Sequence, residues 1–490
     1  MPGICGFYLS DDAWMAGTSG RSGAVLSNGF ALVTSSGLTE RRIVSAAEQL
    51  AANLNFGALA KAEELKKRIW FTLGALLVYR LGTYIPLPGI DPTAWDKIFN
   101  QQAGGILGMF NMFAGGGIHR MAIFALTIMP YISASIIIQL MTTVSPTLEQ
   151  LKKEGEQGRK MINQYTRYLT VVLSAFQAYG IAIGLEGAGS GSVVANPGWF
   201  FVLSTVITLT GGTMFLMWLG EQITQRGIGN GTSLIIMSGI VAQLPTAIAS
   251  TLELGRQGAL STGLILAVLV MGVIVITFIV FMERAQRRLL IQYPKRQVGN
   301  RMFEGQSSHL PLKLNTSGVI PPIFASSLLL LPTTLSSFTA GSNSSATGWL
   351  TTITTMLGQG RPLFLILYVG LIIFFAFFYT AIIFNPTETA DNLKKHGGFI
   401  PGIRPGERTA EYIDYVLSRI TVIGAAYLAI VCLLPQLLIS YAAVPFYFGG
   451  TSLLIVVSVT MDTVAQVQGY LLAHQYEGLI KRSKLRGRRR

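Results

Sequence analysis

Ten apolar runs dominate this 490-residue sequence, and each is long enough, or nearly so, to cross a membrane. They lie at residues 69–86, 120–142, 166–185, 199–219, 232–250, 261–282, 317–337, 363–384, 418–440 and 447–473. A helix of about 20 apolar residues spans the hydrocarbon core of a bilayer. Only 12% of the residues are charged, whereas soluble proteins average about 25%. The sequence therefore predicts an all-α polytopic membrane protein.

Lysine and arginine alternate between the connections that join these runs. The connections after the second, fourth, sixth and eighth runs carry five, one, seven and five of them, and the C-terminal tail carries seven. The connections after the odd-numbered runs carry one, none, one, one and none. Because cytoplasmic loops hold the excess of basic residues, both termini and the even-numbered loops are predicted to be cytoplasmic.

The two longest basic connections contain prolines next to their arginines. Arg404 stands between Pro401 and Pro405, and the stretch "ERAQRRLLIQYPKRQVGNR" contains Tyr293 and Pro294. Proline restricts the backbone, so these loops are predicted to hold cations at fixed places, suited to an acidic groove or to RNA phosphates. For the tail "KRSKLRGRRR", an orientation signal with attraction to anionic lipid headgroups is the simpler interpretation.

One apolar segment, at residues 104–117, is too short to cross a membrane alone. Fourteen helical residues rise roughly 20 Å, against about 30 Å of hydrocarbon. Its large apolar residues fall at i, i+3, i+4 and i+7 of one helical face, and glycines bracket it: Ile106, Met109, Phe110 and Phe113, between Gly104 and Gly117. These residues by themselves favour a re-entrant or interfacial helix packed against its neighbours.

No pattern of an enzyme or a metal site occurs in the sequence. Its two cysteines and four histidines lack ligand spacing, and no GxxxxGK[ST], HExxH or GxSxG motif is present. Catalytic residues, cofactors and metals are therefore not expected. A secondary transporter remains an alternative, but it needs charged or carbonyl ligands at the membrane midplane, where the runs offer little besides Asp462. An intramembrane enzyme lacks a nucleophile and base at suitable spacing.

Eight segments, in order from about residue 46 to the C-terminus, resemble the SecY family, the central subunit of the bacterial protein-translocation channel. They are "YIPLPGID", "MFNMF", "MPYISASIIIQLM", "KKEGEQGRKMINQYTRY", "MWLGEQITQRGIGNG", "VIPPIFASS", "FNPTETADNLKKHGGFIPGIRPGERTAEYID" and "VPFYFGGTSLLIVV". The resemblance implies a channel in the bacterial inner membrane that passes unfolded secretory polypeptides and releases transmembrane segments sideways. It also implies two inverted-repeat halves of five spans, here residues 69–250 and 251–473, closing like a clamshell around an hourglass pore.

By the same resemblance, residues 104–117 are a plug helix, and a ring of aliphatic side chains closes the waist of the pore. The ring positions in this sequence are Ile128, Ile132, Thr232, Ile236, Ile323 and Ile455. Aliphatic side chains do not discriminate between substrates by hydrogen bonding and dewet when the constriction is narrow. Thr232 departs from the aliphatic pattern, and we expect its hydroxyl to bond a carbonyl one turn earlier.

A lateral gate is also implied, between the second and third runs and the seventh and eighth. Polar residues are expected to face each other across it and to form weak interhelical hydrogen bonds. The residues concerned are Ser133, Ser135 and Gln139 on one side and Asn315, Thr316, Ser326 and Ser327 on the other.

The implied partners are the small membrane subunits SecE and SecG, the ATPase motor SecA, translating ribosomes, signal sequences and anionic lipids. The motor and the ribosome are expected to contact the cytoplasmic loops through Lys295, Arg296, Arg301, Arg404 and Arg408.

The N-terminal residues fall outside the resemblance. Residues 1–45 are Gly- and Ser-rich and are predicted to be disordered, or to be a mis-annotated extension preceding a start at Val44. Residues 46–68 are predicted to form an amphipathic helix on the cytoplasmic surface, and residues 474–490 form the basic cytoplasmic tail.

Overall fold

A computed structural model of the chain describes residues 63–102, 111, 114–187, 193–257, 261–293, 296–298, 301–303, 307–339, 361–442 and 450–487. The predicted extension at residues 1–45, residues 46–62 of the predicted surface helix, and most of residues 104–113 lie outside them. Residues 63–68 continue without a break into the first apolar run, as part of one helix.

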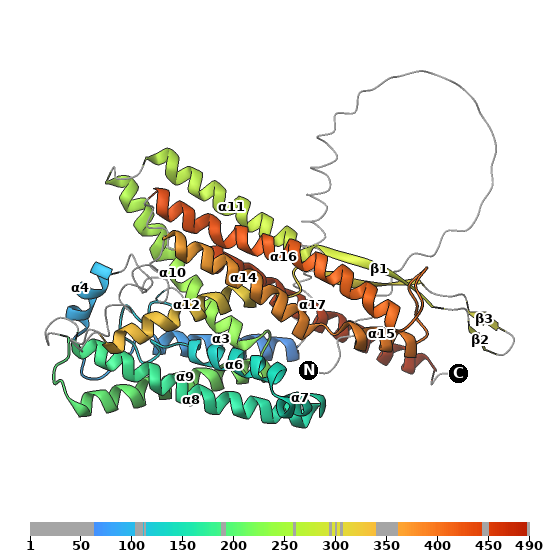
Figure 1. The fold of residues 1–490 in the computed structure, drawn as a ribbon, viewed down its shortest axis with the longest axis horizontal. Helices are drawn as coiled ribbons and strands as arrows, with labels where there is room; N and C mark the ends of the chain where they lie inside the picture. Colours follow the sequence, from blue (N-terminus) through green and yellow to red (C-terminus); the bar gives the residue numbers. More distant parts are fainter. Residues whose placement is uncertain are drawn as a thin grey trace, which may run out of the picture. The chain divides into compact units, whose positions relative to one another are not determined.

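Each of the ten predicted runs overlaps one long helix of the described residues (Figure 1). They are α3 (Glu63–Gly82), α6 (Met129–Val144), α8 (Glu156–Gly187), α9 (Trp199–Arg226), α10 (Gly231–Arg256), α11 (Thr262–Arg284), α12 (Ile320–Thr339), α14 (Pro362–Ile383), α16 (Glu407–Ala442) and α17 (Gly450–Gly487). Within the described residues, seven helices are long and apolar enough to span a membrane, and eight if the bent pair of α6 and α7 (Pro146–Lys153) counts as one span. The chain is thus a multi-span membrane protein.

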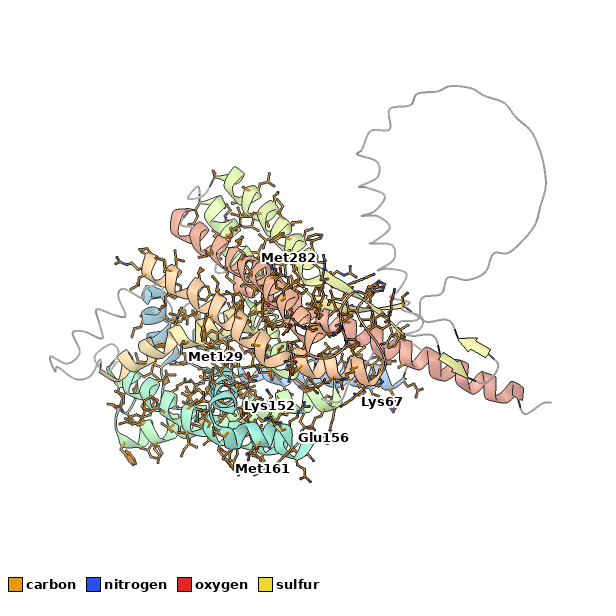
Figure 2. All side chains as sticks on the ribbon, turned by 45° about the vertical axis from the view of Figure 1, so that its right-hand side comes forward. Lys67, Met129, Lys152, Glu156, Met161 and Met282 are labelled. Carbon is orange, nitrogen blue, oxygen red and sulfur yellow. The ribbon has the colours of Figure 1, made fainter. Side chains whose placement is uncertain are left out.

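Many large apolar side chains of these helices point away from the protein interior (Figure 2). On α11, Leu266 and Val273 are each 64% exposed and Phe281 is 69% exposed. A soluble protein would bury such residues, whereas a bilayer solvates them. The outward faces are therefore the surfaces that contact lipid.

The second predicted run, residues 120–142, is helical only in its later part, and this corrects the prediction. Residues 114–128 form turns, and α6 begins at Met129. Met121 and Thr127 have positive φ angles of 44° and 51°, which no α-helix accommodates. Pro130 sits in the first turn of α6, where its missing N–H leaves no hydrogen bond unmade. The predicted helix at residues 104–117 likewise does not include residues 114–117, which are turns.

The packing of the first five long helices recurs in the second five. In the first set, α3 packs against α9 and α10, α6 against α8, α8 against α9, and α9 against α10. In the second set, α11 packs against α16 and α17, α12 against α14, α14 against α16, and α16 against α17. The helices correspond in chain order, so the same pairs of helices are in contact in both sets.

The short elements lie at the two ends of the long helices (Figure 1). At one end are α7, α15 (Pro386–Lys395) and two antiparallel strand pairs, of which β1 (Gln286–Gln292) pairs with β4 (Ser307–Lys313) and β2 (Arg296–Val298) with β3 (Arg301–Phe303). At the other end is α4 (Pro92–Gln102). The basic connections after the second, sixth and eighth runs therefore share one end.

Candidate functional site

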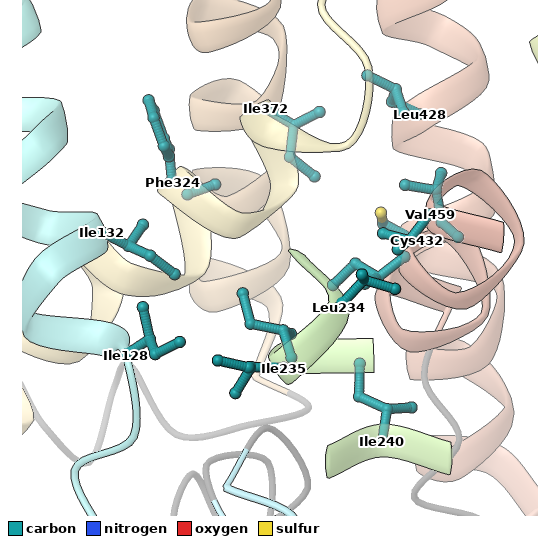
Figure 3. Close-up of a cluster of buried hydrophobic side chains, with 14 of the residues drawn as sticks. Ile128, Ile132, Leu234, Ile235, Ile240, Phe324, Ile372, Leu428, Cys432 and Val459 are labelled. Carbon is teal, nitrogen blue, oxygen red and sulfur yellow. The ribbon is translucent and has the colours of Figure 1, made fainter. Parts of the chain in front are cut away.

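Aliphatic side chains from several helices converge in the interior of the described bundle (Figure 3). Five of the six predicted ring residues take part in this waist cluster: Ile128, Ile132, Ile236 and Ile455 are buried, and the partly buried Ile323 packs against them. Neighbours such as Leu234, Ile235 and Phe324 complete the cluster. The contributing elements α6, α10, α12 and α17 come from both sets of helices.

Local helix geometry explains how each element presents its isoleucines. The amide of Ile132 donates to the carbonyl of Ile128 at 3.0 Å, so the two side chains stand one turn apart on one face. Both are nearly inaccessible to solvent, with 1% of Ile128 and 8% of Ile132 exposed. The five ring isoleucines of this cluster carry no hydrogen-bonding group that could select among passing sequences.

Thr232 differs from the other predicted ring residues. It is only partly buried and is the second residue of α10, whose first residue is Gly231. The carbonyl one turn earlier belongs to Ile228, which precedes the helix, so the expected back-bond within a helical turn was a wrong prediction. Asn230 is the N-cap residue of α10, and its Oδ1 accepts a hydrogen bond of 3.1 Å from the amide of Thr232.

The end of the predicted plug is anchored by α4. Trp95 Nε1 donates to the carbonyl of Ile118 at 2.9 Å, and His119 Nε2 lies 2.8 Å from Asp96 Oδ1. Asp91 caps this helix, and hydrogen bonds from Thr93 lower the pKa of its carboxyl group. The predicted plug residues Gly104, Ile106, Met109, Phe110 and Phe113 lie outside the described residues, whereas Gly117 is buried in the turn at residues 114–117.

The helices predicted to flank the lateral gate, α12 on one side and α6 and α8 on the other, are in contact, and we call this contact the seam. Its polar residues do not bond as expected. Ser326 and Ser327 both donate to the carbonyl of Ile323 in their own helix, and Gln139 Nε2 lies 3.5 Å from Ser135 Oγ in α6. Each of these bonds stays within one helix, and apolar side chains such as Ile132 and Phe324 belong to one buried cluster at the seam.

Asn315 has a different role from the one predicted for it. Its Nδ2 donates to Glu283 Oε1 at 2.7 Å and to the carbonyl of Gly318 at 3.1 Å. These bonds tie the start of α12 to the end of α11. A serine hydroxyl can donate to a carbonyl of its own helix, and an asparagine in a loop can bond either of the helices that the loop joins. Residue type alone therefore suggested the wrong hydrogen-bond partners for these residues.

The two predicted docking loops form one unit at the basic end. Gln292 of β1 and Phe399 exchange backbone hydrogen bonds of 2.9 and 3.0 Å. Leu289, Leu312 and Ile400 are buried together in an apolar cluster beneath them. The hairpin of β1 and β4 therefore braces the loop that carries Arg404.

Arg404 is exposed in that loop, and its carbonyl accepts a 2.9 Å hydrogen bond from Thr409 Oγ1, which fixes the backbone. Arg408 is also exposed and forms an ion pair of 3.3 Å with Glu411. Arg296 and Arg301 belong to the paired strands β2 and β3, while Lys295 and the side chains of Arg296 and Arg301 lie outside the described residues.

Sequence reasoning missed a second contact between the two sets of helices, which we call the joint. It comprises Leu65, Arg68 and Thr72 of α3, Ile228 and Gly229 of the turn between α9 and α10, and Gln466, Tyr470 and Leu471 of α17. The amide of Gly229 donates to Gln466 Oε1 at 2.9 Å, and the amide of Ile228 donates to Thr72 Oγ1 at 3.1 Å. A glutamine within the apolar pattern of the last run was the signal available.

Comparisons with a family model and with known sequences assign this chain to the same family. A sequence model of the SecY family matches residues 122–464. The protein translocase subunit SecY of Rickettsia conorii is 57% identical over 425 residues, covering 86% of this chain and 97% of the relative.

The chain belongs to the SecY family.

Solved structures show the same fold at low sequence identity. One of these structures concerns the plug domain of the SecY protein, which stabilises the closed state of the translocation channel. Its TM-score is 0.56 and its sequence identity is 18%, and the match covers 82% of this chain and 92% of that chain. Sec61 in the canine ribosome-channel complex has a TM-score of 0.53 and 17% identity, with the same coverage. This SecY-family chain is a protein-conducting channel, and the waist cluster is its candidate constriction.

Proposed function

We propose that unfolded secretory polypeptides cross the bacterial inner membrane through the waist cluster, and that transmembrane segments leave sideways through the seam. The observation that carries this proposal is the convergence of aliphatic side chains from both sets of helices in one buried cluster. Such a lining closes by dewetting when empty and fits around any chain when occupied.

The proposed architecture is two halves of five spans, α3 to α10 and α11 to α17, related by an inverted repeat. The repeated packing order of the two sets supports it. In this arrangement the seam is the side that opens, residues 104–117 form a plug in the extracytoplasmic funnel, and both termini are cytoplasmic. The basic loops at one end support the orientation.

The energy for transport comes from partners in this proposal, because the sequence contains no nucleotide-binding motif. The partners are SecA and the translating ribosome at the cytoplasmic loops, SecE and SecG in the membrane, signal sequences at the seam, and anionic lipids along the basic end. Arg404 is the main proposed contact, with Lys295, Arg296, Arg301 and Arg408 beside it. Its exposure on a braced loop supports the assignment.

Crosslinking of a stalled secretory precursor tests the proposed path. Cysteines replacing Ile128, Ile236 and Ile455 should each crosslink to the stalled chain, whereas a cysteine replacing the lipid-facing Leu266 should not. A precursor that crosses the membrane without touching any waist position would refute the path.

Charge reversal tests the docking loop. Arg404→Glu should abolish motor-driven export while the channel complex still assembles, because the loop is exposed and its fold does not depend on the guanidinium. Arg419→Glu, at an exposed arginine stacked on Tyr415 4.3 Å away, is the matched control. Normal export by the Arg404→Glu channel would refute the docking role.

A further inference from the structure

Asp462 is the one charged residue in the membrane-spanning part of α17, Gly450–Ala473. It follows Ile455 of the waist cluster by seven residues. Seven residues of α-helix return a side chain to nearly the same face, about 10 Å further along the axis. From there α17 runs on toward the end of the bundle where the basic loops lie (Figure 1). Asp462 therefore shares a helix face with Ile455, on the basic side of the waist cluster.

Contacts on both sides of Asp462 fix the direction of this face. Ile455 is 0% exposed and belongs to the waist cluster. Gln466 lies one turn beyond Asp462, and its Oε1 accepts the hydrogen bond from the amide of Gly229 in the joint. Because both neighbours on the face are directed toward the interior of the bundle, Asp462 between them is directed there as well. The residue is nevertheless exposed, so a ligand can reach its carboxylate.

The charge of Asp462 is not compensated. Among the residues that the structure describes, it forms no ion pair. Glu283, at the end of α11, lies within electrostatic range of Asp462. Glu283 has partners of its own, because it accepts a 2.7 Å hydrogen bond from Asn315 Nδ2 and lies within electrostatic range of Lys313. Ionisable residues in membrane-spanning helices are costly and commonly mark the path of a substrate or an ion. The partner that this carboxylate lacks is a cation.

Two other waist helices present polar but uncharged side chains on the basic side of the waist. On α6, which leads toward α7 at the basic end, Gln139 follows Ile132 by seven residues. On α10, which begins at the joint, Thr232 precedes Ile236 by one turn. Asp462 is thus the only charged member of these three positions, and it lies between the cationic loops at the rim and the apolar waist.

We propose that Asp462 is a specificity-determining residue of the channel, which pairs with the basic N-terminal region of a signal sequence while the apolar region of that signal lies against the seam. The proposal rests on the proposed function. A secretory signal begins with a positively charged region, followed by an apolar stretch of roughly 7–15 residues. With the apolar stretch beside α6 and α12, the charged region lies on the basic side of the waist. The loops at the rim repel this region, whereas Asp462 attracts it.

Export rates of precursors that differ only in this N-terminal region test the pairing in the assembled channel. Asp462→Asn keeps the shape of the side chain and removes its charge. We expect export of a precursor with a basic region to fall about threefold to fivefold, the range of one exposed ion pair, and export of a precursor with a neutral region to stay unchanged. Asp462→Glu should keep the wild-type preference. Asp414→Asn, at an exposed acidic residue of α16, is the matched control and should change neither rate.

Reversal of the charge separates recognition from a structural role. Asp462→Lys should export a precursor with an acidic N-terminal region faster than one with a basic region, which inverts the wild-type order. Loss of a structural contact would slow both precursors alike.

The unsubstituted channel carries the test if these variants do not assemble. A photoreactive side chain in the basic region of a stalled precursor should crosslink to the stretch of α17 that contains Asp462. Crosslinks confined to the loops at the basic end would overturn the role of Asp462, as would an equal dependence on precursor charge in the Asp462→Asn and wild-type channels. Either result leaves the proposed function standing if cysteines at the waist crosslink to the stalled chain, whereas absence of those waist crosslinks would contradict the proposed function itself.

Discussion

The seam and the joint both connect the two sets of helices, yet they are built from different interactions. At the seam, α12 meets α6 and α8 through apolar side chains, and the serines of α12 bond their own helix. At the joint, a backbone amide of the turn between α9 and α10 donates to Gln466 of α17, and Arg68 lies 5.2 Å from the centre of the Tyr470 ring.

This difference matters because the two contacts respond differently to separation in a membrane. Apolar helix faces lose little when lipid or an apolar segment replaces their neighbour, since lipid tails are as apolar as the side chains. Separation at the joint leaves the buried Gly229 amide without an acceptor, which costs free energy. The seam is therefore suited to opening and the joint to remaining closed.

The largest expected effect comes from locking each contact covalently. A short crosslink between cysteines replacing Ile132 and Phe324, which belong to one buried cluster across the seam, should abolish export. A crosslink between cysteines replacing Ile228 and Leu471, which are buried together at the joint, should leave export unchanged. Export rates of a secretory precursor before and after crosslinking provide the measurement.

A longer, flexible crosslinker at the seam serves as the control and should restore export. The comparison fails if locking the joint stops export as completely as locking the seam.

An intermediate effect is expected from removing the acceptor at the joint. Gln466→Ala leaves the Gly229 amide unpaired and should lower the free energy of unfolding by about 1–3 kcal/mol. Ser326→Ala at the seam should change it by less than about 0.5 kcal/mol, because the hydroxyl only bonds its own helix. Thermal inactivation of the purified complex measures both.

Gln466→Glu retains an oxygen acceptor and should recover most of the lost stability. Equal losses for Gln466→Ala and Ser326→Ala would show that the hydrogen bond does not distinguish the two contacts.

A smaller effect than that of Gln466→Ala is expected at the edge of the joint. Arg68→Ala removes the cation from the face of the Tyr470 ring, a contact worth about 0.5–1 kcal/mol at an exposed site. Arg68→Lys keeps a cation there and should lose less. If Tyr470→Leu makes no difference to the cost of Arg68→Ala, the cation and the ring do not interact.

The sequence predicted those features of this chain that depend on composition over many residues. Each of the ten apolar runs overlaps a long helix of the described chain, although α6 covers only the later part of the second run. About 20 apolar residues leave few alternatives in a bilayer. The ring isoleucines were identified through the family resemblance. Their hydrophobicity by itself predicts only that they are buried, as any core residue would be. Their convergence in one cluster is a finding of the structure.

Features that depend on a single hydrogen bond were not predictable. The sequence of residues 120–128 has the hydropathy of a membrane-spanning run, but the structure forms turns there. The positive φ angles of Met121 and Thr127 exclude a helix at these residues. Polar residues at the seam could bond within or between helices, and the sequence does not decide which. Arg80, Thr72 and Gln466 act on backbone groups far away in the chain, and no local pattern marks such partners.

Distances between spin labels across the two contacts test the central claim most directly. One pair, at Thr143 and Thr316, reports on the seam, and the other, at Arg226 and Leu472, reports on the joint. With a stalled precursor in the channel, we predict that the seam pair moves apart while the joint pair keeps its resting distance. Separation of the joint pair, or a seam pair that stays at its resting distance, would contradict the account.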